Sequence, residues 1–263
     1  MDKIQETLKL HQQTAIDKGY NVFCTYLQGS QNYSLDYEGS DIDTKTITIP
    51  SIDDIVLNKK PVSTTHVLDD NSHDDQKDIR VMFSTFHKQN INFLEILFTK
   101  YYLINPFYEK EIQELFDMAD DIANINNNQL LRCIAGMSME KFKALEHPYP
   151  TLIEKLEKFK YDPKQLHHIC RLNEFIRRHT SGESFRDCLV TKDRDNLVEI
   201  KKGREPLENA RIIAEALNND TYEIKEKFKT EKDVVNKKVI EDLNVLLGKI
   251  IKKSFIEELK MNG

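Results

Sequence analysis

The pattern of apolar and polar positions divides the chain into two parts with different periods. Before about residue 104, short apolar or β-branched runs alternate with helix-like spacing; after Pro106, nearly every segment repeats its apolar residues every three to four positions. Only 8 glycines and 7 prolines occur in 263 residues, so few tight turns are expected. This pattern predicts an α+β fold in which a small mixed sheet is followed by a helical part.

Strands are predicted where short β-favouring runs end at a breaker, over residues 21–27, 41–49 and 61–68. The polar and acidic stretch 69–77 is expected to be a loop or a tight turn back into the sheet. Helical spacing is found over residues 3–18, 51–57, 79–98, 107–119, 129–146, 151–159, 163–180, 206–217, 221–228 and 231–260. We therefore expect two domains, residues 1–104 with the sheet and residues 105–263 made of helices. The apolar stripe of the last helix is expected to serve packing or an oligomer contact, so a homo-oligomer is one possible state.

Composition and charge narrow the class of protein. The chain has 38 basic and 44 acidic side chains, a net charge of −6, which argues against a protein that coats duplex nucleic acid. No apolar run approaches the roughly 18 residues that a membrane span needs, so no membrane partner is expected. The 4 cysteines form no CxxC pair, which makes structural zinc or a disulfide framework improbable. The first residues lack the apolar core of a signal peptide, and a cytoplasmic location is expected.

The chemistry suggested by the sequence is concentrated in one short stretch. Gly29-Ser30 ends the first predicted strand, and Asp41-Ile42-Asp43 begins the second. Carboxylates two residues apart on a strand point to the same face, about 7 Å from each other, and repel unless a cation lies between them. Such oxygen ligands suit Mg²⁺, which prefers a few carboxylates together with substrate phosphates, and a glycine lets the backbone approach a phosphate closely. The plain alternative is an ordinary turn followed by a solvated strand edge.

Gly29-Ser30 followed by Asp41-Ile42-Asp43 resembles the signature of the DNA polymerase beta-like nucleotidyltransferase superfamily. More narrowly, the chain resembles the bacterial and phage family of predicted nucleotidyltransferases over about residues 20–215. Three later segments carry the narrower resemblance: Asp78 leading into the helix with Phe86, the stretch from Asn92 to Phe98, and the stretch from Lys164 to Leu172. The resemblance implies a palm-like nucleotidyltransferase domain at residues 1–104, with Asp41 and Asp43 as catalytic metal ligands.

The resemblance also implies a third carboxylate from a neighbouring strand, which the family pattern places at Asp78. Asp74 and Asp75 are competitors, and Asp78 has an alternative role as the N-cap of the following helix. Glu95 lies in a very apolar run and is either functional or a buried structural acid with a partner such as Arg80 or Arg132. His66, His73 and His87 are too scattered in the sequence to be proposed as a metal site.

A second group of candidates lies on one predicted helix. Lys164, His168 and Arg171 fall at i, i+4 and i+7, so one helix face would present all three to a triphosphate. A solvated basic stripe is the alternative, and His167 points elsewhere on the helix. The basic turn at 201–205 is expected to be a solvated loop, with a phosphate-binding role as the second possibility.

These parts imply a metal-dependent nucleotidyltransferase that uses Mg²⁺, with Mn²⁺ as a substitute. Gly29 and Ser30, with Lys164, His168 and Arg171, would bind the nucleoside triphosphate, ATP by default; Asp41, Asp43 and Asp78 would hold the metal. The acceptor hydroxyl is open: an RNA 3′ end, a small molecule or a protein side chain. The alternative function is a catalytically inactive nucleotide-binding or protein-interaction module that keeps the fold.

Overall fold

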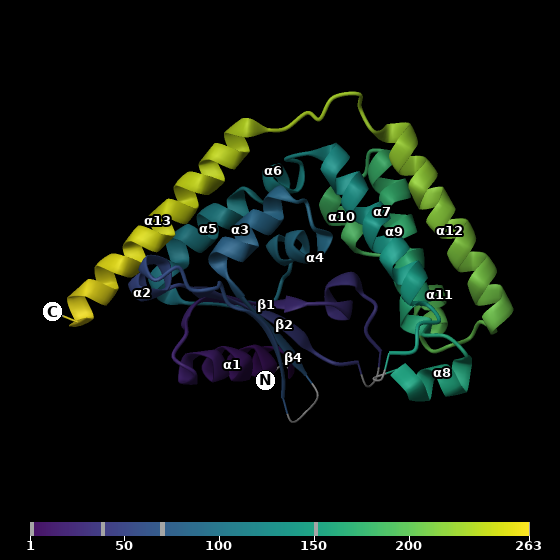
Figure 1. Ribbon diagram of the computed structural model, residues 1–263, viewed down its shortest axis with the longest axis horizontal. Coiled ribbons are helices and arrows are strands. Elements are labelled where there is room, and N and C mark those ends of the chain that lie inside the picture. The colour runs from purple at the N-terminus through teal and green to yellow at the C-terminus, as the bar shows by residue number, and fades with distance from the viewer. Residues whose placement is uncertain (1–2, 38–39, 69–71, 150–151, 263) are drawn as a thin grey trace. The chain divides into compact units, whose positions relative to one another are not determined.

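The structure, a computed structural model, describes residues 3–37, 40–68, 72–149 and 152–262 (Figure 1). The described chain forms two compact units that are not consecutive halves. The first unit contains residues 3–32, 40–125 and 235–262, and the second contains 33–37, 126–149 and 152–234. None of the helices in these ranges is long and apolar enough to cross a membrane.

The first unit is built on one five-stranded sheet. Its strands are β1 (Asn21–Gln28), β2 (Asp43–Ile49), β3 (Ser63–Val67), β4 (His73–Asp78) and β5 (Tyr102–Ile104), in the spatial order β3-β4-β2-β1-β5. β2 pairs parallel with β4, whereas the pairs β1–β2, β1–β5 and β3–β4 are antiparallel. The sheet is therefore mixed, as the sequence predicted, and the parallel pair lies at its centre.

Helices of the first unit cover both faces of this sheet. They are α1 (Lys3–Asp17), α2 (Ile52–Val56), α3 (Ile79–His87), α4 (Ile91–Leu94), α5 (Glu109–Asp117), α6 (Ala119–Ala123) and α13 (Lys237–Asn262), with 3-10 turns η1 (Ser30–Tyr33), η2 (Glu95–Leu97) and η3 (Pro106–Tyr108). α1 covers one face, and α3 and α5 lie on the other, with α13 packed against both of them (Figure 1). Apolar residues of α13 such as Leu243, Leu246 and Ile250 are fully buried there, so the stripe of the last helix serves packing within the unit.

The face under α1 is polar although it is buried. The carboxylate of Asp74 on β4 accepts hydrogen bonds from the hydroxyls of Thr44 and Thr46 on β2, at 3.0 and 2.7 Å, and from the Gln76 amide at 2.7 Å. His11 of α1, fully buried, contacts the Thr44 hydroxyl at 2.7 Å. Because buried polar groups need partners, this network fixes which side of β4 faces α1.

The prediction of a loop or tight turn over residues 69–77 is wrong for residues 73–77, which lie in a strand. Residues 69–71 lie outside the described residues, but His73–Asp78 forms β4, between β2 and β3. The apolar signal for a strand is missing here because the inward residues Asp74, Gln76 and Asp78 are all polar. The hydroxyls of Thr44 and Thr46 on the neighbouring β2 offset the burial of Asp74, and these partners are visible only in the tertiary structure.

The second unit consists of helices only in its described part. Its elements are α7 (Asn127–Ala144), α8 (Ile153–Phe159), α9 (Pro163–Thr180), α10 (Phe185–Leu189), α11 (Arg194–Lys201) and α12 (Leu207–Phe228). α9 packs against α7, α10, α11 and α12 and forms the centre of the unit. The two helices expected at 206–217 and 221–228 are one continuous helix, because Asn218 and Thr221 are buried at its middle and hydrogen-bond to α7 and α9.

The division into units also differs from the expected boundary near residue 104. α5, α6 and α13 belong to the unit that contains the sheet. The first unit therefore includes helices that directly follow the sheet in the sequence and also the last helix of the chain. Helical periodicity shows that a segment has an apolar face but not which unit covers that face.

Replacing Asp74 by alanine tests the buried network. Three buried donors would lose their acceptor, so Asp74→Ala is expected to lower the free energy of unfolding by about 2–4 kcal/mol. Urea unfolding measures this loss. Asp53→Ala, a change at an exposed acid of the same unit, serves as the control and should stay within about 0.5 kcal/mol of the wild type. A similar small effect for both variants would contradict a stabilising role of Asp74.

Candidate functional site

Gly29 forms a sharp turn directly after β1, beside the start of β2. Its φ angle is +87°, a conformation that residues with a Cβ adopt only at a cost. A Cβ placed on Gly29 would lie 3.6 Å from the Asp43 carboxylate oxygen Oδ2. The glycine therefore brings the backbone of the Gly29-Ser30 turn close to a carboxylate, as the spacing of the two motifs suggested.

The two acids of the Asp-x-Asp motif differ in their local structure. Asp43 is the first residue of β2 and is partly exposed, whereas Asp41 precedes the strand and is exposed. The side-chain amide of Gln31 donates to the backbone carbonyl of Asp41 at 2.8 Å, which ties the motif to η1. Strand geometry therefore orients only Asp43, and a local hydrogen bond holds the backbone of Asp41.

Asn32 fixes the other side of the turn. Its amide donates to the carbonyl of Leu27 at 2.8 Å, and its side-chain oxygen accepts from the hydroxyl of Thr99 at 2.7 Å. The turn that carries Ser30 is thus attached both to β1 and to the segment before β5. Ser30 itself is half-buried, with its hydroxyl 3.5 Å from the side-chain oxygen of Gln31.

His73 is a site neighbour that the sequence analysis missed. Its ring nitrogen Nδ1 lies 3.0 Å from Asp43 Oδ1. The contact arises from the β2–β4 register, which pairs Thr44 with Asp74 and so places the preceding residues side by side. No local pattern could have indicated it, because 30 residues separate His73 from Asp43.

Asp78, the expected third carboxylate, is placed elsewhere. It ends β4 beside Thr48, five residues and therefore about 16 Å along the strands from the position of Asp43. Its carboxylate caps α3 by accepting from the backbone N–H of Arg80 at 2.8 Å, and it forms an ion pair with the Arg80 guanidinium at 2.6 Å. The helix-cap interpretation is confirmed, and the assignment of Asp78 to the metal is corrected because its position and partners serve the helix.

The two competitors lie on opposite faces of β4. Asp74 points to the buried network under α1, away from Asp43. Asp75 lies on the same face as Asp43 but forms ion pairs with Lys45 at 3.4 Å and with Lys77 at 2.8 Å. Neither Asp74 nor Asp75 is therefore a simple replacement for Asp78 as the third metal-binding carboxylate.

Lys45 brings a buried positive charge close to this face. Its ammonium group donates to the carbonyl of Asn92 and lies 3.9 Å from the centre of the Phe93 ring. Burial lowers the pKa of Lys45 to about 8, and the nearby Asp75 carboxylate opposes this effect. Glu95, the acid of the apolar run, is also buried, while the two partners suggested for it pair with other acids, Arg80 with Asp78 and Arg132 with Asp233.

The predicted basic helix face belongs to the second unit. It lies on α9, which begins with Asp162 as N-cap and Pro163 in the first turn and ends with basic residues, as helix termini favour. Lys164 is exposed. Arg171 is 7% exposed and stacks on the ring of Tyr33, 3.8 Å from its centre. The guanidinium thus has a packing role within its own unit.

His167 and His168, two of the three histidines of α9, are held neutral by their surroundings. Burial lowers the pKa of His168 well below its ordinary value, and the positive charge of Arg171 adds to this effect. His168 is therefore a neutral imidazole rather than the cation that the sequence suggested. Burial also lowers the pKa of His167 to about 4, and its ring contacts the Leu197 carbonyl at 2.9 Å.

The basic turn after α11 packs on an aromatic side chain. The ammonium groups of Lys201 and Lys202 lie 5.0 and 5.8 Å from the centre of the Tyr37 ring, and Arg204 pairs with Glu205 at 2.7 Å. These contacts show side chains engaged within the second unit. They do not require a phosphate.

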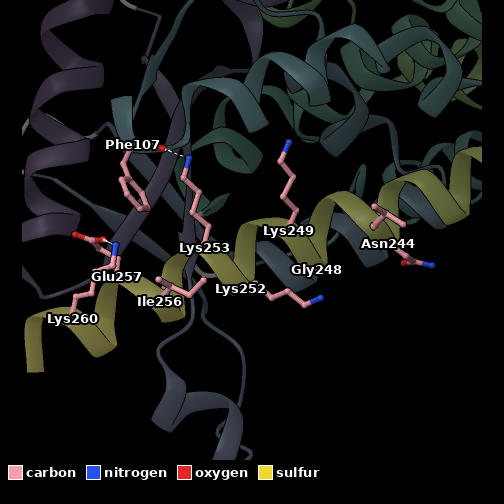
Figure 2. A pocket seen from close by; sticks show the side chains of 10 residues that line it. Phe107, Asn244, Gly248, Lys249, Lys252, Lys253, Ile256, Glu257 and Lys260 are labelled. Carbon is pink, nitrogen blue, oxygen red and sulfur yellow. Dashed lines mark hydrogen bonds and ion pairs between the residues drawn. The ribbon is translucent and has the colours of Figure 1, made fainter. Parts of the chain in front are cut away.

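A groove of about 810 Å³ runs along α13, separate from the carboxylates of the candidate site (Figure 2). Its lining residues are Phe107, Asn244, Val245, Gly248, Lys249, Lys252, Lys253, Ile256, Glu257 and Lys260. Lys253 and Lys249 pair with Glu111 and Glu114 of α5, at 2.8 and 2.6 Å, so they contribute to the attachment of α13. None of the predicted site residues lines this groove.

Comparisons with known proteins found only a weak structural similarity. No protein-family model matches the chain, and no curated protein matches it. Among solved structures, it is similar to a nucleotidyltransferase-like protein from Exiguobacterium sibiricum 255-15, with a TM-score of 0.33 and 13% identity over 95% of this chain and 89% of that one. A likeness this low carries no argument about the reaction.

Substitution of Gly29 tests the conformation of the turn. Gly29→Ala is expected to lower the free energy of unfolding by about 1–2 kcal/mol, because alanine is strained at the positive φ of this position. Gly248→Ala provides a matched control in the same unit, since Gly248 is in the interior of α13 with open space around it. That change should stabilise the protein by about 0.5–1 kcal/mol. Equal effects of the two changes would contradict the role assigned to Gly29.

The buried histidines predict a dependence of stability on pH. The pKa of His167 is about 4 in the folded protein and near its ordinary value of 6.5 when unfolded, so between these pH values the unfolded chain binds more protons. The free energy of unfolding should therefore fall as the pH decreases from about 6.5 toward 4. In His167→Asn this fall should be smaller, by roughly 2–3 kcal/mol. Urea unfolding of both proteins at several pH values, each referred to pH 8, measures the difference, and parallel curves would contradict the assignment.

Proposed function

We propose that the chain is a metal-dependent nucleotidyltransferase, which transfers a nucleoside monophosphate from a nucleoside triphosphate to an acceptor hydroxyl and releases pyrophosphate. The observation that carries the proposal is the Gly29 turn against Asp43. A positive-φ glycine, a serine and two acids that lie 10 or more residues away in the sequence are brought to one edge of a mixed sheet. A solvated turn and strand edge would not require this close approach.

The residues present fit a divalent cation that is bound together with the nucleotide. Asp43 Oδ2 faces the open Gly29 side of the turn, and Asp41 is exposed. Within the described ranges, no three His, Cys, Asp or Glu side chains are grouped as a ready metal site. Mg²⁺ commonly uses one or two carboxylates and completes its shell with substrate phosphates and water, so Asp41 and Asp43 would hold it. When bound, the cation neutralises phosphate charge and lowers the pKa of a coordinated hydroxyl.

The Gly29 turn would supply the phosphate contacts. In this proposal the Ser30 hydroxyl donates a hydrogen bond to a phosphate oxygen, and Gly29 leaves room for that phosphate beside Asp43. Lys164, His168 and Arg171 stay candidates for the triphosphate from the sequence alone, because they belong to the second unit and Arg171 packs there on Tyr33. ATP is the default nucleotide. The acceptor hydroxyl is open and belongs to an RNA 3′ end, a small molecule or a protein side chain.

One observation favours the second candidate function, a nucleotide-binding module without catalysis. Asp75 and Asp78 both form ion pairs with basic side chains, Asp75 with Lys45 and Lys77 and Asp78 with Arg80. A paired carboxylate is a poor additional metal ligand, because the cation must compete with the existing positive charge. Such a module would bind a metal–nucleotide complex and would not release pyrophosphate.

Replacement of both motif acids tests the catalytic proposal. Asp41→Asn with Asp43→Asn is expected to abolish transfer of label from α-³²P-labelled nucleoside triphosphates to acceptors in a cell extract, because the cation loses both carboxylates. More than about a tenth of the wild-type rate, a loss under roughly 1.4 kcal/mol in activation free energy, would contradict the assignment. Asp53→Asn, at an exposed acid outside the site, is the control and should keep the wild-type rate.

Ligand-induced stabilisation separates the two candidate functions. With Mg²⁺ or Mn²⁺ and a triphosphate together, the melting temperature should rise more than with either alone, because the cation joins protein and phosphate. Equal stabilisation by nucleotide with and without EDTA would overturn the metal-bridged site. The full rise without any transfer of label from the four α-³²P-labelled nucleoside triphosphates to an acceptor would favour the inactive module.

A further inference from the structure

The His73–Asp43 pair at the start of the parallel strands suggests a ligand that no sequence motif marks. His73 comes from β4 and Asp43 from β2, and the β2–β4 register places them side by side on the face opposite the Asp74 network. The third acidic ligand was expected on the same strand, at Asp78 or at its competitors Asp74 and Asp75. Beside Asp43, however, β4 presents the imidazole of His73.

The geometry of the pair matches two adjacent ligands of one cation. His73 Nδ1 and Asp43 Oδ1 are 3.0 Å apart. Two ligands at right angles, each about 2.1 Å from an octahedral metal, are also separated by about 3.0 Å. With the ring hydrogen on Nε2, Nδ1 offers its lone pair, so the same two atoms that share a hydrogen bond can share a metal ion.

Stability gives little reason for this contact. The side chains of His73 and Asp43 are 41% and 31% exposed, and ion pairs at such exposed positions contribute little to folding. The other acids near β4 are engaged with Lys, Arg or Thr side chains, whereas this pair borders the Gly29 turn, where Asp43 Oδ2 is also directed. The pair is therefore placed for a ligand.

We propose that His73 is a metal ligand together with Asp43, and that the site prefers Mn²⁺ or a similar first-row dication over Mg²⁺. Imidazole nitrogen suits transition metals, whereas Mg²⁺ selects oxygen ligands. Asp41, water and the phosphates of the nucleotide complete the shell. The inference rests on the proposed function for the nucleotide, but metal binding by the pair can be measured without it.

Binding of Mn²⁺ alone to the full chain, followed by electron paramagnetic resonance, tests the proposal. The wild type should bind Mn²⁺ at least about tenfold more tightly than Mg²⁺ in competition, and pulsed spectra should show hyperfine coupling from an imidazole nitrogen. His73→Ala should lose that coupling and about tenfold or more in Mn²⁺ affinity. His73→Asp, which makes the ligands all oxygen, should lower the ratio of Mn²⁺ to Mg²⁺ affinity by about tenfold. His66→Ala on β3 is the matched control and should keep the coupling and the affinity.

The outcomes separate this proposal from the proposed function. Unchanged nitrogen coupling in His73→Ala, an unchanged affinity ratio in His73→Asp, or no Mn²⁺ binding by the wild type would overturn the ligand role of His73. In each case Asp41 and Asp43 could still support transfer, which the labelling experiment decides. If the wild type shows no nucleotidyl transfer but binds Mn²⁺ through His73, the proposed reaction is overturned and the proposed metal site stands. Circular dichroism of each variant confirms that the fold is kept.

Discussion

Parallel pairing of β2 with β4 is the constraint on which the candidate site depends. Successive residues of a strand point to opposite faces, so a slip of one residue would turn Asp74 toward Asp43 and His73 toward α1. The buried carboxylate of Asp74 opposes this slip, because it accepts hydrogen bonds from the Thr44 and Thr46 hydroxyls of β2, which reach it in this register. A polar network under α1 thereby determines which side chains reach the opposite face.

Electrostatics then separates the acids of the first unit by role. Asp74, Asp75 and Asp78 have partners from neighbouring strands or from α3, and their charge is used to hold the sheet and cap a helix. Asp41 and Asp43 are the more exposed acids beside the Gly29 turn. A cation with phosphate oxygens relieves the repulsion between two neighbouring carboxylates, which is why these two acids carry the proposed function.

The segment that links the two motifs belongs to the helical unit. Residues 33–37 follow Ser30 and precede Asp41, yet they pack with the second unit. Arg171 stacks on Tyr33, and Arg194 donates to the carbonyl of Asp36 at 2.8 Å. The same α9 face that was expected to bind phosphate thus holds part of the segment that links the glycine turn to the acids.

The sequence by itself determined the α+β class, most helices, the strands near Asn21 and Thr44, and the joint occurrence of Gly29-Ser30 with Asp41 and Asp43, because local periodicity and short spacing carry those features. The tertiary structure alone decided that residues 73–78 form a strand and that His73 lies against Asp43. It also decided that α13 packs against α3 and α5, in the unit that contains the sheet. The physical reason is the same in each case: the partners that make a polar strand, a ligand pair or a helix–helix contact favourable come from distant parts of the sequence.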